Sequence, residues 1–85
     1  MNVIETLAER GKLYGDFTTH AQITQELKDV VGRHGAHLSP IHKEAIDMIL
    51  HKIGRILNGD PNYADSWHDI AGYATLVEQR VSVKP

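Results

Sequence analysis

The sequence predicts an all-α fold, a compact bundle of four helices that forms one domain over residues 1–85. Two observations support this prediction. Apolar residues recur at helical spacing in four segments separated by glycine-containing breaks, and no stretch alternates apolar and polar residues as a strand does. The predicted helices cover about residues 2–13, 18–34, 40–58 and 63–81.

The first two predicted helices are joined by a short connector. Helix 2–13 has an apolar stripe formed by Val3, Ile4, Leu7 and Ala8. The segment 14–17, Tyr-Gly-Asp-Phe, is expected to be the connector. Helix 18–34 is expected to begin at Thr18 or Thr19, because a threonine hydroxyl can accept a hydrogen bond from a free N–H of the first turn.

The third predicted helix, 40–58, has the strongest pattern. Ser39 followed by Pro40 is typical of a helix start, since proline is tolerated at the first helical position. At about 100° per residue, the apolar positions cover about half of the circumference, which is wide for an outer helix. We therefore expect this helix at the centre of the bundle.

The fourth predicted helix, 63–81, is expected to be capped by Asp60 or Asn62. Its main apolar face is expected to comprise Trp67, Ile70, Ala71, Ala74, Val77 and Val81. A second face contains Asp69 and Gly72. Because glycine inside a helix costs about 1 kcal/mol relative to alanine, Gly72 indicates close approach by another helix, a second chain or a ligand.

Composition and charge restrict the partners. The net charge is -2, and nine Lys and Arg are scattered among eleven Asp and Glu, whereas nucleic-acid binders usually carry a clustered basic face. We therefore expect no DNA or RNA partner. The chain has no cysteine and no long apolar segment, so we expect a cytoplasmic protein without a membrane partner. A chain of 85 residues buries only about 60% of its unfolded surface, which favours a homo-oligomer.

Polar residues that suggest a site lie between Lys52 and Leu76. Lys52 falls inside the apolar arc of its helix, where it must extend to solvent, pair with a carboxylate or face a cavity. Asp65 and Asp69 are four residues apart on one helix face and repel each other unless a cation lies near. Either Lys52 pairs with one of these aspartates and fixes the helix register, or the group surrounds a ligand.

Other site chemistries find less support. The six histidines match no zinc-ligand spacing, so we expect them at the surface or at the edges of apolar stripes. There is no cysteine nucleophile, and no serine lies in a nucleophile elbow. The glycines do not have the spacing of a phosphate-binding loop.

Three sequence elements resemble those of small helical proteins encoded by phages and prophages, some of which are associated with nucleotide modification. They are Tyr14-Gly15-Asp16, Lys52-x-x-Arg55-Ile56 and Asp65-x-x-x-Asp69-Ile70-Ala71-Gly72-Tyr73-Ala74-x-Leu76. The resemblance covers about residues 13–76. More distantly, the chain resembles the MazG-type all-α nucleoside triphosphate pyrophosphohydrolases, which are commonly dimers or tetramers.

The MazG-type resemblance implies a magnesium site. These enzymes hold Mg²⁺ against nucleotide phosphates with the helical pairs Glu-x-x-Glu and Glu-x-x-Asp. Glu44-Ala-Ile-Asp47 is similar to the first pair, and Asp69 is similar to the last acid of the second. The resemblance therefore implies Glu44, Asp47 and Asp69 as ligands of Mg²⁺. Ser66 stands where the leading acid of the second pair belongs, and this departure argues against hydrolysis.

The resulting hypothesis is a phage or prophage accessory protein, in the host cell cytoplasm, that binds a nucleotide or a similar phosphate compound. Its ligand-binding residues would be Lys52, Arg55, Asp65, Asp69, Tyr14 and Trp67. The two cations would contact phosphate, and Tyr14 or Trp67 would stack on a base. Whether the chain is an enzyme stays open, with a non-catalytic role favoured; if it is one, it is a magnesium-dependent pyrophosphohydrolase. The alternative is a protein–protein interaction module in which the charged residues form a structural ion-pair network.

Overall fold

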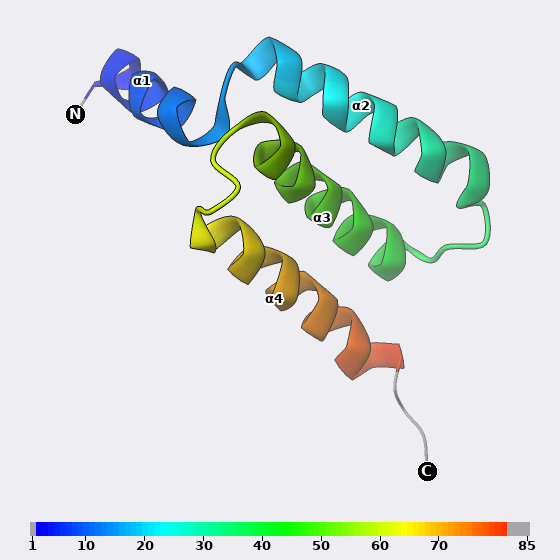
Figure 1. The fold of residues 1–85 in the computed structure, drawn as a ribbon. Helices are drawn as coiled ribbons and strands as arrows, with labels where there is room; N and C mark the ends of the chain where they lie inside the picture. The colour runs from blue at the N-terminus through cyan, green and yellow to red at the C-terminus, as the bar shows by residue number, and fades with distance from the viewer. Residues whose placement is uncertain (1, 82–85) are drawn as a thin grey trace.

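The computed structural model describes residues 2–81 and confirms an all-α bundle of four helices (Figure 1). The helices are α1 (Val3–Tyr14), α2 (Phe17–His34), α3 (Pro40–Asn58) and α4 (Ala64–Val81). Each bound differs from the predicted one by one residue at most. The described residues contain no strand.

Side-chain caps explain where the first three helices begin. Asn2 and Glu5 form a reciprocal capping box at α1, and the Ser39 hydroxyl accepts the His42 N–H at α3, with Pro40 in the first turn. At α2 the cap is Asp16, whose Oδ2 accepts the Thr19 N–H at 3.0 Å. The prediction of a threonine cap is therefore wrong, because α2 begins earlier, at Phe17, and the Asp16 carboxylate caps its first turn.

Helix α4 begins without the expected use of Asp60. The Asp60 carboxylate accepts the N–H of Asn62 at 2.9 Å, so it stabilises the loop rather than the helix. Tyr63 occupies the position before α4, and its carbonyl accepts the Ser66 N–H at 3.2 Å.

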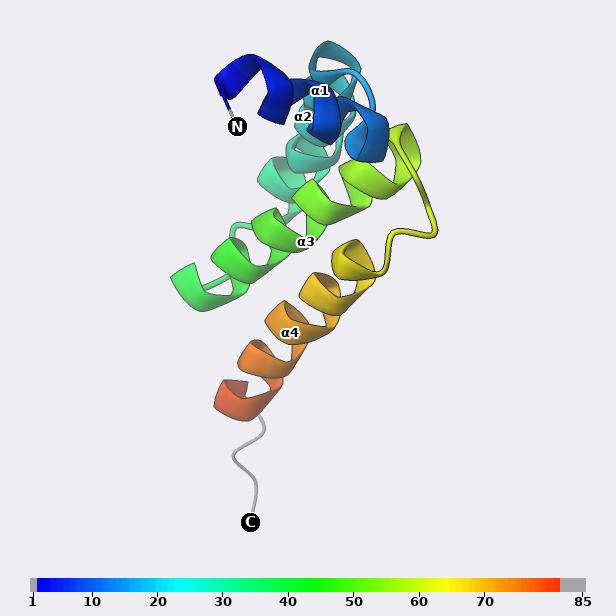
Figure 2. The same cartoon turned by 90° about the vertical axis from the view of Figure 1, so that its left-hand side faces the viewer.

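Helix α3 is the central element, as the width of its apolar arc predicts. It packs against each of the other three helices, and α2 and α4 lie on its two sides without packing on each other (Figure 1). Helix α1 also contacts α2 and crosses the end of the bundle where α3 finishes (Figure 2).

The connector between α1 and α2 is held on the C-terminal end of α3. The Asn58 side-chain amide donates to the carbonyls of Tyr14, at 3.0 Å, and of Asp16, at 2.7 Å. The Asp60 N–H donates to the Leu13 carbonyl at 2.8 Å. Gly15 has a φ of 80°, and a Cβ there would overlap the Asn58 carbonyl, so this position requires glycine.

The interior is small and largely polar. Within the described residues Ala45 is the one buried hydrophobic side chain, accompanied by the buried polar residues His20, Thr24 and Ser66. Gly54 is also buried, where α3 meets α2. Small residues at these contacts let the helix backbones approach closely, but they remove little apolar surface from water.

Helix α4 packs through a face that coincides only in part with the predicted one. Ser66 is buried, and Ile70, Tyr73 and Val77 are half-buried, all on the side of α3. In contrast, Trp67, Ala71, Ala74 and Val81 are exposed. The predicted apolar face is therefore correct for Ile70 and Val77 and wrong for Trp67, Ala71, Ala74 and Val81. The small Ser66 side chain and the Lys52–Asp69 pair bring a neighbouring face of the helix toward α3.

Gly72 lies on the outer side of α4. A Cβ there would meet no atom within 4 Å. Of the three expected reasons for this glycine, close approach by another helix of the same chain is therefore wrong. A second chain or a ligand remains as the explanation.

Candidate functional site

A cleft of about 540 Å³ opens where α1, α2 and α3 meet. Its polar and aromatic lining consists of Arg10, Tyr14, Asp16, Phe17, His20, His51 and Arg55. The connector held by Asn58 places Tyr14 and Phe17 on one side, while α3 supplies His51 and Arg55 one turn apart. The cleft therefore combines cationic, aromatic and imidazole groups from three helices.

Arg55 lies over the ring of Tyr14. The guanidinium carbon is 4.0 Å from the ring centroid, which is the geometry of a cation–π interaction. The edge of the Tyr14 ring meets Tyr63, with centroids 5.9 Å apart. Within residues 2–81, Arg55 forms no ion pair with a carboxylate. Its charge is thus oriented by an aromatic face and not neutralised by an acid.

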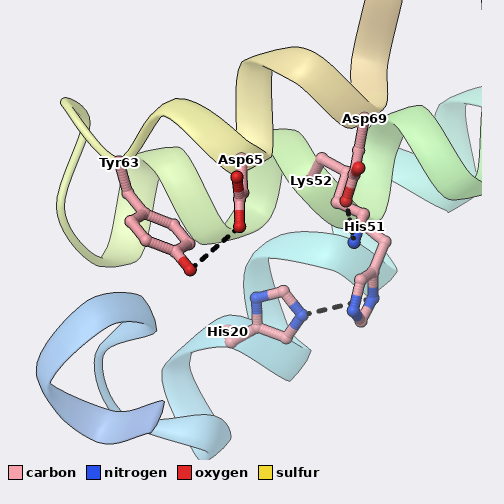
Figure 3. Close-up of polar contacts among 6 residues, drawn as sticks. All are labelled: His20, His51, Lys52, Tyr63, Asp65 and Asp69. Carbon is pink, nitrogen blue, oxygen red and sulfur yellow. Dashed lines mark hydrogen bonds and ion pairs between the residues drawn. The ribbon is translucent and has the colours of Figure 1, made fainter. Parts of the chain in front are cut away.

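His20 and His51 form a pair at the inner wall of the cleft (Figure 3). Their facing nitrogens, His20 Nε2 and His51 Nδ1, are 3.4 Å apart, and the two rings meet edge to face. His20 Nδ1 is buried and has no hydrogen-bond partner within the described part of the chain. Which of the two imidazoles donates in the pair is set by their tautomers.

Both imidazoles are neutral near pH 7. Burial, and then the charge of Arg55, lower the pKa of His20. The same two causes, followed by His20, Lys52 and Lys28, lower the pKa of His51 to about 4. Three cationic side chains therefore act on His51. These positive charges disfavour the imidazolium form of His51.

Lys52 and Asp69 form an ion pair beside this wall (Figure 3). The Lys52 Nζ is 3.0 Å from Asp69 Oδ2, and the side chains are 11% and 42% exposed. Of the two arrangements that the sequence leaves open, the structure therefore shows the one in which Lys52 has a carboxylate partner. Neither residue lines the cleft, so the phosphate contact expected of Lys52 is not part of the cleft geometry.

The other two residues of the expected site lie apart from the cleft. Asp65 Oδ2 accepts the Tyr63 hydroxyl at 3.1 Å, and this hydrogen bond raises the pKa of Tyr63. Trp67 is 54% exposed, and its Nε1–H donates to the Pro61 carbonyl at 2.8 Å. Of the two aromatic residues proposed for stacking, only Tyr14 lines the cleft.

The whole helical bundle matches one family model, Domain of unknown function (DUF6378), over residues 2–81. The chain belongs to this family. No curated protein and no solved structure matches the DUF6378 chain. Within its described residues, no helix is both long and apolar enough to cross a membrane.

The DUF6378 chain does not assemble the expected magnesium ligands. Among residues 2–81, no three His, Asp or Glu side chains are grouped so that they could hold a metal ion. Asp69 is paired with Lys52, whereas Glu44 is exposed and lines a separate groove between α3 and α4. Ser66, in the position of the missing acid, is buried toward α3. Glu44, Asp47 and Asp69 are therefore not grouped into one metal site within residues 2–81, and their role as Mg²⁺ ligands stays a prediction.

The cleft of the DUF6378 chain also includes residues that the sequence did not single out. They are Arg10, Asp16, Phe17, His20 and His51. One sequence signal would have indicated the histidine pair. Gly54 interrupts a strong helix pattern, and its missing side chain leaves space for His20.

Proposed function

We propose that this chain binds a nucleotide or a similar phosphate compound in the cleft between α1, α2 and α3. The observation that supports the proposal is the position of Arg55, which lies over the ring of Tyr14 and has no carboxylate partner within the described residues. A guanidinium oriented in this way can donate two parallel hydrogen bonds to a phosphate. The cleft volume of about 540 Å³ lies within the range of small-molecule sites.

The phosphate would lie between Arg55 and Arg10, and the base would lie toward the mouth of the cleft. Phe17 is 77% exposed there and offers a free ring for stacking. One face of Tyr14 is already covered by Arg55, so Phe17 is the better stacking residue. The neutral imidazoles of His20 and His51 would contribute hydrogen bonds without adding charge.

The direct test is a thermal-shift and calorimetric titration with nucleoside triphosphates and pyrophosphate, with and without Mg²⁺. We expect a nucleotide to raise the Tm of the wild type. In Arg55→Gln the nucleotide should lose at least about 90% of its affinity, since the loss of about 1.4 kcal/mol of binding free energy lowers the affinity tenfold. Arg33→Gln, an exposed arginine at the far end of α2, is the matched control and should bind normally. A wild type that binds no phosphate compound would overturn the proposal.

We favour binding without catalysis. Asp69 is paired with Lys52, and a serine replaces the acid that the MazG-type pattern requires. If Mg²⁺ takes part, phosphate oxygens or a second chain would supply the ligands that one chain does not gather. Release of pyrophosphate or phosphate from nucleotides by the purified chain, abolished in Asp69→Asn, would instead support a magnesium-dependent pyrophosphohydrolase.

A protein–protein interaction module is the second candidate. It is supported by the exposure of the apolar stripe of α1, where Val3, Ile4 and Leu7 are all exposed. In this role Lys52 and Asp69 serve only to fix how α4 sits on α3. The absence of any nucleotide effect on Tm, combined with lower stability of Asp69→Asn, would favour this candidate.

The proposed setting is the host cytoplasm, with the chain acting as a phage or prophage homo-oligomer. The resemblance of the Lys52–Leu76 segment to phage-encoded proteins supports the origin, and the lack of cysteine suits a reducing compartment. The exposed apolar side chains support self-association. We expect phage genes to lie beside the coding sequence. We also expect cell fractionation to recover the chain in the cytoplasmic fraction.

A further inference from the structure

The chain exposes more surface than a single domain of its size should. Its accessible surface is 6207 Å², whereas a typical folded monomer of 9.5 kDa exposes about 5,000 Å². Its radius of gyration is 14.9 Å, compared with about 12 Å for a typical domain of 85 residues. The surplus of accessible surface over the whole chain is about 1,200 Å².

Part of the exposed apolar surface lies between α3 and α4. A groove of about 380 Å³ runs along the N-terminal part of α3 and the C-terminal part of α4. Its apolar lining includes Ile41, Leu76 and Val77, with Ala45 at the floor. Ile41 and Leu76 are each 48% exposed, so two large side chains of the groove remain half in water.

The two walls of the groove carry opposite charges. Glu44 is on the α3 wall and Arg80 is on the α4 wall, and both are exposed. No ion pair joins them within residues 2–81, and the Arg80 Nη1 donates to the Leu76 carbonyl of its own helix. The apolar floor therefore lies between an unpaired acid and an unpaired base of the described chain.

This pattern is self-complementary. In a two-fold dimer, the same patch of both subunits is used, so that the residue on one wall meets the residue on the other wall of the partner. A two-fold axis that runs along the groove, between the two copies, would bring the α3 wall of one copy onto the α4 wall of the other. Each Glu44 would then face an Arg80, twice in the dimer, while the apolar side chains pack between them.

We propose that the occupant of the α3/α4 groove is a second copy of this chain, docked about a two-fold axis and aligned by two Glu44–Arg80 pairs between subunits. The inference rests on the proposed self-association but not on the ligand of the cleft.

Charge reversal with mixing tests the proposal. The wild type should sediment as a dimer. Glu44→Arg and Arg80→Glu should each raise the dimer dissociation constant by at least about tenfold, because each homodimer then contains two like-charge contacts. An equimolar mixture of the two variants should recover a dimer, since both of its contacts pair opposite charges. Native mass spectrometry, with one variant carrying a small mass tag, should identify that species as the heterodimer.

Matched charge reversals on α2 serve as controls. Glu26→Arg and Arg33→Glu change exposed residues of another helix and should leave the dimer intact. Circular dichroism should show the same helix content in all variants. A wild type that stays monomeric up to its solubility limit overturns self-association. If Glu44→Arg and Arg80→Glu leave the dimer dissociation constant unchanged, this face is not the interface. The same conclusion follows if both variants weaken the dimer but their mixture does not form a heterodimer.

Discussion

The imidazole of His20 lies directly against the backbone of Gly54. A Cβ placed on Gly54 would be 3.0 Å from His20 Cε1 and 3.2 Å from its Nδ1. The same ring faces His51 on its other side and is only 6% exposed, so it has little room to move. The close contact of α2 with α3 and the inner wall of the cleft therefore depend on one missing side chain.

Substitution of Gly54 by alanine should destabilise the fold. Alanine is the better helix former by about 1 kcal/mol, but overpacking a filled contact costs about 1–3 kcal/mol. We expect a net loss of about 1 kcal/mol in the free energy of unfolding, measured by urea denaturation. Gly72→Ala is the matched control, because a Cβ there meets nothing within 4 Å of the chain. If the free energy of unfolding of Gly54→Ala equals that of Gly72→Ala, the His20 ring can move away from the added methyl group.

The Lys52–Asp69 pair should matter more for stability than for ligand binding. Asp69→Asn leaves the largely buried Lys52 ammonium without its carboxylate, although the exposure of Asp69 limits the cost. We expect a loss of about 1–2 kcal/mol in unfolding free energy, below the value for fully buried pairs.

The double variant Lys52→Met with Asp69→Asn should recover part of that loss, since no buried charge remains. Nucleotide affinity should be unchanged in both, because neither residue lines the cleft. Loss of binding in Asp69→Asn at unchanged stability would instead place this aspartate in the site.

Stability should fall in mild acid because of His51. The pKa of this side chain is about 4 in the folded chain, compared with 6.5 for an unperturbed histidine. The unfolded chain therefore takes up a proton first, so stability is full above about pH 6.5 and declines as the pH falls toward 4.

The decline from this residue alone should reach about 1–2 kcal/mol at pH 4. Each pKa unit corresponds to about 1.36 kcal/mol, and solvent around the half-buried ring screens part of the effect. Urea denaturation at several pH values measures the decline. In His51→Gln it should be shallower, whereas His37→Gln, in the exposed loop before α3, should keep the wild-type slope. If the slope of unfolding free energy against pH is the same in His51→Gln as in the wild type, His51 is not the cause of the decline in acid.

Removal of the Arg55 charge should raise the pKa of both histidines. Arg55 is the second largest cause of the lowered pKa at His20 and at His51, after burial. In Arg55→Gln we therefore expect both imidazoles to titrate at higher pH in an NMR titration of the folded protein. Arg33→Gln provides the control, and equal pKa values in Arg55→Gln and the wild type would show that burial alone lowers them.

The helices were predictable because their signals are local. The apolar period, the Ser39-Pro40 start and the glycine breaks place every helix end to within one residue. The inward face of α4 was not predictable in the same way. Two apolar or small faces compete on this helix, and the choice is made by contacts with α3, through the small Ser66 side chain and the Lys52–Asp69 pair.

The cleft was predictable only in part. The sequence predicts Tyr14 and Arg55 as ligand-binding residues, but their direct contact depends on Asn58, which holds the α1–α2 connector on the end of α3. His20 and His51 are 31 positions apart in the sequence, and no spacing rule joins them. Their pairing follows from the packing of two helices at a glycine.

The attachment of the connector by Asn58 and Asp60 also limits which changes in chain length the protein can accept. Three carbonyl contacts, at Leu13, Tyr14 and Asp16, must keep their register with the end of α3. An inserted residue between Tyr14 and Phe17 would displace the tyrosine from Arg55 and open the cleft. The loop before α3 has exposed residues at Ala36 and His37, so insertions there should be absorbed without effect on the cleft. Length variation among related chains is therefore expected in the second connection and not in the first.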